Sequence, residues 1–166
     1  NEYKKNNIKI TNNLLDIIKT NNIKHLVFSS TAAVYKVSNK TLNEKSFLSP
    51  NNIYGKTKLL GEQKIQSLMP INAIIIRTSW LYSEFGKNFV ASIIKNAQKK
   101  KTLDVINDQF GSPTYASDLA NSILKIVTSI ANFNFRIETQ IYHFSNIGEC
   151  SWYDFACEII RQSNID

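Results

Sequence analysis

Apolar residues recur at helical spacing in five segments of the chain. In the first segment, Leu14, Ile17 and Ile18 fall on one face of a helix, and polar residues occupy most of the remaining positions. The same periodicity predicts helices over residues 3–20, 54–68, 87–100, 115–130 and 151–161. Ser151 and Asp154 have the spacing of a capping box, which places the start of the last helix.

Short apolar runs lie between these helices and are typical of strands covered on both faces, as in parallel sheets. The runs are residues 24–29, 73–76, 103–106 and 140–144, and the polar segment 31–50 is expected to be a loop. Alternating helices and strands predict crossover connections and therefore an α/β fold with a doubly wound parallel sheet. A length of 166 residues without a fixed-period repeat fits a single α/β domain.

Composition and charge exclude several classes of protein. The chain is 43% hydrophobic and 20% charged, which fits a globular protein, and no apolar run is long enough for a membrane span. The net charge of +7 comes from scattered lysines with a single run at 99–101, so we expect no nucleic-acid partner. Cys150 and Cys157 are not spaced as metal ligands, and neither are His25 and His143, so we expect no metal site. Two cysteines are also too few for a disulfide scaffold, so we expect a cytoplasmic protein.

Tyr54 and Lys58 are the first candidates for chemistry. Four residues apart at the start of a predicted helix, they lie on one face, one turn from each other. An ammonium at that position favours the phenolate form of the tyrosine, which can then exchange a proton with a substrate oxygen. The alternative is an aromatic residue at a helix start beside a solvated lysine.

A run of hydroxyls at residues 29–31 follows the first predicted strand directly. The carboxyl ends of strands in α/β sheets form the crevice where ligands bind. Thr31 could therefore hydrogen-bond the same substrate oxygen that Tyr54 protonates. The alternative is that these hydroxyls satisfy loop backbone.

In this order and spacing, these two segments resemble the extended short-chain dehydrogenase/reductase family, whose fold is Rossmann-like. The resemblance implies that Thr31, Tyr54 and Lys58 form a catalytic triad. Asn7 falls where the family often has a fourth catalytic residue. The implied cofactor is NADPH or NADH.

Motifs within residues 76–156 narrow the resemblance to the dTDP-4-dehydrorhamnose reductase branch. The motifs are Arg-Thr-Ser-Trp-Leu-Tyr at 77–82, Gly-Lys-Asn-Phe-Val at 86–90, Asn-Asp-Gln-Phe-Gly-Ser-Pro-Thr at 107–114, Asp-Leu-Ala at 118–120, and 141–156. One stretch departs from the branch. Ser-Thr-Ala-Ala-Val-Tyr at 30–35 is more similar to the sugar-nucleotide epimerases.

The branch implies further roles for residues outside the triad. Tyr54 and Lys58 would also contact the cofactor, with Thr78 and Ser79 near its nicotinamide. The implied substrate is a nucleotide sugar, and residues 81–166 would form most of its binding region, with residues 1–80 as the catalytic part. A magnesium ion and a homodimer occur in some members of the branch. The residues implied on the substrate side are Thr31, Ala32, Trp80, Asp108 and Gln109.

The chain contains five glycines, and none of them approaches the Gly-x-Gly-x-x-Gly spacing of a dinucleotide loop. The family holds the cofactor pyrophosphate on that loop, so we expect these residues to be the C-terminal portion of a reductase fold. Their sheet would then have an open edge, and a separate N-terminal half chain is one expected partner.

Three functions fit these observations. The first is a reductase that transfers hydride to the 4-keto group of a nucleotide sugar, as in dTDP-rhamnose and polysaccharide biosynthesis. The second is a sugar-nucleotide epimerase, which the residues at 30–35 favour and the Trp80 segment opposes. The third is an inactive fragment or a non-enzymatic binding subunit, which the absence of a glycine-rich loop favours.

Overall fold

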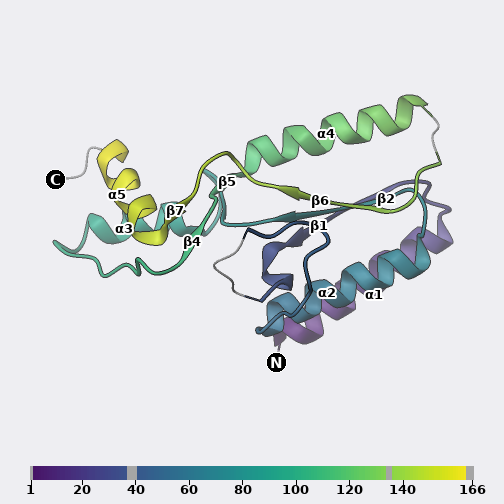
Figure 1. The fold of residues 1–166 in the computed structure, drawn as a ribbon, viewed down its shortest axis with the longest axis horizontal. Coiled ribbons are helices and arrows are strands. Elements are labelled where there is room, and N and C mark those ends of the chain that lie inside the picture. Colours follow the sequence, from purple (N-terminus) through teal and green to yellow (C-terminus); the bar gives the residue numbers. More distant parts are fainter. Residues whose placement is uncertain (1, 37–40, 134–135, 164–166) are drawn as a thin grey trace. The chain divides into compact units, whose positions relative to one another are not determined.

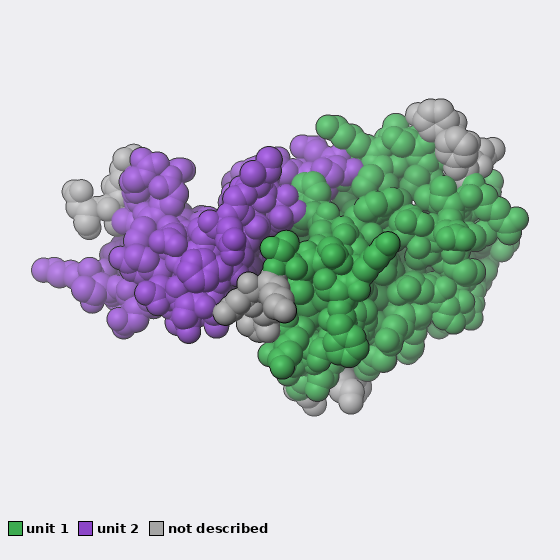
Figure 2. Space-filling model, in the orientation of Figure 1, with its two compact units in different colours: residues 1–78, 123–144 green, residues 79–122, 145–166 purple. Residues whose placement is uncertain are grey.

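The computed structural model describes residues 2–36, 41–133 and 136–163. The chain forms two compact units, which Figure 2 distinguishes by colour. Unit 1 comprises residues 1–78 and 123–144, and unit 2 comprises residues 79–122 and 145–166. The chain therefore passes from one unit to the other after residues 78, 122 and 144.

A three-stranded parallel sheet with strand order β1-β2-β6 forms the centre of unit 1. β1 spans Leu26–Thr31, β2 spans Ala73–Thr78 and β6 spans Gln140–Phe144. Every residue of β2 is buried, as expected for a central strand with both faces covered. The register places Thr31 beside Thr78 at the carboxyl edge of the sheet. The predicted α/β class with a parallel sheet is confirmed.

Helices cover both faces of this sheet. The helices α1, Glu2–Thr20, and α2, Ile53–Leu68, lie on one face, and the part of α4, Ala116–Phe133, that belongs to unit 1 lies on the other (Figure 1). The buried core between α1, α2 and β2 consists of Leu15, Ile18, Ile65, Met69, Ala73 and Ile75. Among the described residues, no helix combines the length and the apolar character that a membrane crossing requires.

The start of α2 is fixed by a cap and by a close backbone approach. The Asn52 side chain accepts a hydrogen bond from the Gly55 N–H at 2.7 Å, which satisfies one of the free donors of the first turn. A short 3-10 helix, η1, spans Ala32–Val34 and follows β1 directly. A Cβ atom on Gly55 would lie only 2.1 Å from the carbonyl oxygen of Ala33. Glycine therefore allows α2 to begin against η1, next to the end of β1.

Unit 2 combines helices with very short strands. Its helices α3, Phe89–Ala97, and α5, Trp152–Ser163, pack together through Ile93, Ala156 and Ile159. Its strand pairs are β3, Leu81–Tyr82, with β5, Thr114–Tyr115, and β4, Phe110–Gly111, with β7, Cys150–Ser151. The sequence did not predict these strands because two residues are too few to show an alternating pattern.

The prediction of a strand at residues 103–106 is wrong, because these residues form no strand in the structure. Leu103 and Val105 instead pack against the apolar cluster of α3 and α5, and this packing accounts for the apolar character of the segment. The predicted capping box of α5 is confirmed. The Ser151 hydroxyl accepts from the Asp154 N–H and the Asp154 carboxylate accepts from the Ser151 N–H, both at 3.0 Å.

The Gly55→Ala substitution should destabilise the protein by about 1–3 kcal/mol, because a methyl group would force α2 away from the Ala33 carbonyl. Urea unfolding followed by circular dichroism measures this change. Lys56→Ala is the matched control, since Lys56 is the exposed neighbour on the same turn. Equal stability of Gly55→Ala and Lys56→Ala would show that the helix start has room to move.

Candidate active site

Two threonines end the neighbouring strands β1 and β2 at the carboxyl edge of the sheet. Thr31 and Thr78 are partners in the register, and both are buried. The Thr31 hydroxyl accepts a hydrogen bond from the Ala33 N–H at 3.1 Å and caps η1. The Thr78 hydroxyl oxygen is buried and has no hydrogen-bond partner within the part of the chain that is described. A buried hydroxyl without a partner is uncommon, and it marks this edge as a place where a ligand could bind.

The first two turns of α2 bring Tyr54 and Lys58 to this edge. Tyr54 is 47% exposed. The Lys58 ammonium donates to the Ser29 carbonyl oxygen at 2.6 Å and lies 4.3 Å from the centre of the Phe28 ring. Burial lowers the pKa of Lys58, and the nearby charge of Glu62 partly offsets this effect. The predicted positions of the triad in the fold, at a strand end and in the first turns of the next helix, agree with the structure.

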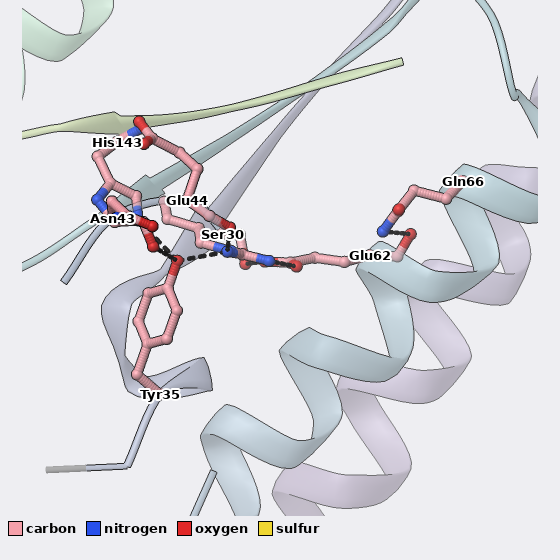
Figure 3. Close-up of polar contacts among 8 residues, drawn as sticks. Ser30, Tyr35, Asn43, Glu44, Glu62, Gln66 and His143 are labelled. Carbon is pink, nitrogen blue, oxygen red and sulfur yellow. Dashed lines mark hydrogen bonds and ion pairs between the residues drawn. The ribbon is translucent and has the colours of Figure 1, made fainter. Parts of the chain in front are cut away.

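A buried ion pair lies one turn further along α2. Glu62 and Arg77 have side-chain exposures of 0% and 1%, and two parallel hydrogen bonds join them. Arg77 Nε donates to Oε1 of Glu62 at 3.0 Å, and Nη2 donates to Oε2 at 2.6 Å. The Ser30 hydroxyl also donates to Oε1 of Glu62 (Figure 3). These contacts connect α2 with both β1 and β2.

Tyr35 extends this network to β6. Its buried hydroxyl accepts from Arg77 Nη1, donates to the Asn43 carbonyl oxygen at 3.1 Å, and lies 2.7 Å from Nε2 of His143 (Figure 3). Because its single proton is directed at Asn43, the geometry fits an Nε2–H tautomer of His143 that donates to Tyr35. Burial is the main cause that raises the pKa of Tyr35, and the Arg77 charge opposes it.

Glu44 attaches the loop after η1 to the same network. Its carboxylate accepts from the backbone N–H of His143 at 2.8 Å, and its carbonyl oxygen accepts from Arg77 Nη1 at 3.3 Å. The hydrogen bond from His143 holds the pKa of Glu44 below its usual range. We name the residues joined in this way the Arg77 network: Ser30, Tyr35, Asn43, Glu44, Glu62, Arg77 and His143.

Sequence reasoning did not find this network. A signal was present, because Arg77 follows an apolar run in a predicted buried strand and a buried guanidinium requires a partner. The partner could not be identified, since Glu62 is a distant position on a different element. For His143 the sequence showed only that it lacks ligand spacing, and the structure places it in the network through Tyr35.

Two predicted residues of unit 2, Trp80 on the substrate side and Ser79 on the cofactor side, already have contacts within the protein. The Trp80 ring stacks on Trp152, with 3.5 Å between centroids and 10° between planes, so one indole face is covered. A Cβ atom on Gly111 would lie 2.7 Å from the Trp80 ring, which explains the need for glycine there. The Ser79 hydroxyl donates to the Ser112 carbonyl oxygen at 2.9 Å. Trp80 also has a φ of 44°, an uncommon backbone angle for a bulky residue.

The remaining predicted site residues are Asp108, Gln109, Ala32 and Asn7. Asp108 and Gln109 are exposed, and the Gln109 carbonyl oxygen accepts from the Trp152 N–H at 3.3 Å. Ala32 begins η1. Asn7 lies in α1, but its side chain is outside the described part of the structure. Among the described residues, no group of three His, Cys, Asp or Glu side chains could hold a metal ion, so the magnesium ion that some members of the branch bind has no support here.

Comparisons with known proteins agree with this architecture. The family model described as RmlD substrate binding domain matches residues 2–166. The chain is 45% identical over 119 residues to the spore coat polysaccharide biosynthesis protein SpsK of Bacillus subtilis, covering 72% of this chain and 39% of that protein. It is 38% identical over 142 residues to dTDP-4-keto-6-deoxy-D-glucose reductase of Streptomyces niveus, covering 85% and 47%.

A solved structure gives the same result. The dTDP-4-dehydrorhamnose reductase of Bacillus anthracis in complex with NADP has a TM-score of 0.76 and 36% identity, covering 86% of this chain and 48% of that one. The fold and the placement of Tyr54 and Lys58 define a Rossmann-like member of the extended short-chain dehydrogenases/reductases. Within that class, the chain belongs to the family of the RmlD substrate-binding domain. It spans 39% and 47% of the lengths of the two curated relatives.

The stability of the protein should fall in mildly acidic solution through His143. Burial lowers the pKa of His143, with Arg77 adding to this effect and Glu44 opposing it. As the pH falls below about 6.5, the unfolded chain therefore takes up a proton at His143 before the folded chain does. Thermal unfolding between about pH 7.5 and about pH 5 measures the loss.

The His143→Gln variant should show a flatter pH dependence over this range, because glutamine does not titrate. Glu44 also has a lowered pKa, but its contribution is lost only below its usual value of 4.5 and so falls outside the window. A His143→Gln variant that keeps the wild-type slope would show that another group causes the acid sensitivity.

Proposed function

We propose that this chain carries the catalytic residues of a nucleotide-sugar 4-ketoreductase that uses NADPH or NADH, acting on dTDP-4-dehydrorhamnose or a close relative in cell-surface polysaccharide biosynthesis. The observation that carries the proposal is the position of Tyr54 and Lys58, on a capped helix start at the strand end occupied by Thr31. The reductase names of homologous proteins support the substrate class.

In this proposal, Tyr54 delivers a proton and Thr31 orients the substrate. When bound, the reduced nicotinamide supplies a hydride to the carbonyl carbon of the sugar. The Tyr54 phenol donates a proton to the carbonyl oxygen, on which negative charge develops. The Thr31 hydroxyl donates to the same oxygen while still accepting from the Ala33 N–H, because a hydroxyl can do both.

Lys58 and Thr78 would hold the nicotinamide end of the cofactor. Lys58 spends one of its donors on the Ser29 carbonyl oxygen, which leaves two for the ribose hydroxyls. The buried Thr78 hydroxyl lacks a partner among the described residues, and a polar ligand group would satisfy it. Ser79 is a weaker candidate because its hydroxyl is already bonded to Ser112. Asn7 is proposed as the fourth catalytic residue.

We place Ala32, Trp80, Asp108 and Gln109 on the side of the sugar nucleotide. Trp152 covers one face of the Trp80 indole and Gly111 lies against the same ring, so Trp80 can contact a pyranose only through the surface that these two residues leave open. The exposed side chains of Asp108 and Gln109 remain available to sugar hydroxyls. A cytoplasmic location belongs to the same proposal, and the proposed partner is either a second copy of this chain or a separate chain that carries the glycine-rich loop.

An epimerase is the second candidate, because residues 30–35 resemble that group more closely than the reductases. The two functions differ in the fate of the hydride. A reductase consumes one equivalent of NADPH or NADH for each sugar converted, whereas an epimerase returns the hydride and consumes none. Cofactor absorbance during conversion of a 4-keto sugar nucleotide therefore separates them.

Tyr54→Phe should lower kcat by about 100- to 10,000-fold in the full-length protein, by which we mean this chain with a glycine-rich loop on the same or a partner chain. The reason is that phenylalanine cannot donate a proton. Substrate affinity should change little, and cofactor affinity should fall by no more than about tenfold, because Tyr54 would contribute at most one hydrogen bond to the cofactor. Tyr142→Phe is the matched control, because Tyr142 is also about half exposed, at 46%, and has no proposed role. Equal activity of the two variants would remove Tyr54 from the mechanism, and no cofactor oxidation in the wild type would refute the reductase.

A further inference from the structure

The Glu62–Arg77 ion pair lies next to the proposed catalytic residues, on the same helix. Glu62 follows Lys58 by one turn and Tyr54 by two, so all three lie along one face of α2. We propose that the Glu62–Arg77 pair is a positioning element. It fixes the position of α2 along the sheet and thereby holds Lys58 and Tyr54 in place for catalysis. This inference rests on the function proposed above.

The geometry of the pair suits this role because it is directional. Glu62 accepts from two nitrogen atoms of Arg77 on β2 and from the Ser30 hydroxyl on β1. Paired, planar hydrogen bonds between guanidinium and carboxylate tolerate little displacement. Apolar contacts, such as those in the core of α1, α2 and β2, are not directional, whereas a shift of the helix would distort these bonds directly.

Lys58 depends on the same position of the helix. Its ammonium is bonded to the carbonyl oxygen of Ser29, and the next residue of β1, Ser30, is bonded to Glu62. Two successive turns of α2 are therefore attached to two successive residues of β1. A shift of the helix would disturb the Lys58 contact and the Glu62 contact together. A displacement of about 1 Å can cost about 100-fold in rate, which is the size of effect at stake.

The groups that surround Lys58 also support this positioning role. Tyr54 and Glu62 face it from its own helix, and the Phe28 ring and the Ser29 carbonyl face it from β1. The charge that acts on the pKa of Lys58 is that of Glu62, whose own partner is Arg77 on β2. Glu62 supports the ammonium form of Lys58 against the effect of burial. The pair therefore also fixes the carboxylate that favours the ammonium form of Lys58.

Stability alone would not require an ion pair at this place. Replacing a buried pair with apolar residues of similar volume is often neutral or stabilising, because it removes the cost of desolvating two charges. Leucine and methionine could fill the space of Glu62 and Arg77 but could not reproduce the directional bonds. A double variant of this kind therefore separates positioning from folding.

The experiment compares the full-length wild type with the double variant Glu62→Leu/Arg77→Met. Urea unfolding should show similar stability. The kcat for the 4-keto sugar nucleotide should fall about 10- to 100-fold, with KM within about threefold, since the substrate contacts are intact. Labelling of Lys58 by an amine reagent, followed by mass spectrometry across pH, should be several-fold faster, because the ammonium is no longer held at Ser29.

Further variants keep the test decisive if the double variant does not fold. Ser30→Ala removes one bond to Glu62 without leaving a buried charge unpaired, and should give a smaller change of the same kind in both kcat and Lys58 labelling. Glu158→Gln breaks an exposed ion pair in unit 2 and should change neither quantity. Wild-type kcat and wild-type Lys58 labelling in a folded double variant, or in Ser30→Ala if only that variant folds, would overturn the inference.

The two readouts distinguish failure of the inference from failure of the proposed function. A wild type without reductase activity, or a fully active Tyr54→Phe variant, would refute the function. The labelling of Lys58 would still show whether the pair holds that side chain in place. Unchanged labelling and turnover in the pair variants, beside an inactive Tyr54→Phe, would refute only the positioning role.

Discussion

The buried ion pair between Glu62 and Arg77 is the interaction on which the arrangement of unit 1 depends. Two charges removed from water are costly unless each is fully hydrogen-bonded, and breaking such a pair typically costs about 3–5 kcal/mol. Here the Ser30 hydroxyl also bonds to the carboxylate, and the Tyr35 hydroxyl and the Glu44 carbonyl oxygen accept from the guanidinium. Because these partners come from different elements, the charges are stable only when β1, β2 and α2 are correctly assembled.

The Glu62–Arg77 pair lies next to the carboxyl edge of the sheet, where the proposed catalytic residues are. Ser30 is bonded to Glu62, and the following residue, Thr31, ends the strand beside Thr78. The position of the start of α2 is fixed separately, by the Asn52 cap and by the close approach of Gly55 to the Ala33 carbonyl. The helix is therefore held at its first turn and again two turns later. A side chain between these two attachments, as Lys58 is, has little freedom to shift.

The sequence predicted those parts of the molecule that local patterns determine. Periodicity located the long helices and the three sheet strands, and the spacing of Tyr54 and Lys58 identified the candidate chemistry. It failed where an apolar segment packs without strand partners, at residues 103–106, and where strands are two residues long. Sequence patterns also could not predict the Arg77 network, because its hydrogen bonds join positions as distant in sequence as Tyr35 and His143. No local pattern records such pairings.

The most direct test of this account is a crystal structure of the full-length protein with NADPH bound. We predict that the Lys58 ammonium lies within hydrogen-bond distance of the nicotinamide ribose, with the Tyr54 hydroxyl beside the same ribose and the bonds between Glu62 and Arg77 unchanged. A cofactor bound away from Lys58, or a helix α2 displaced along the sheet with the ion pair broken, would contradict the claim that this pair sets the position of the catalytic helix.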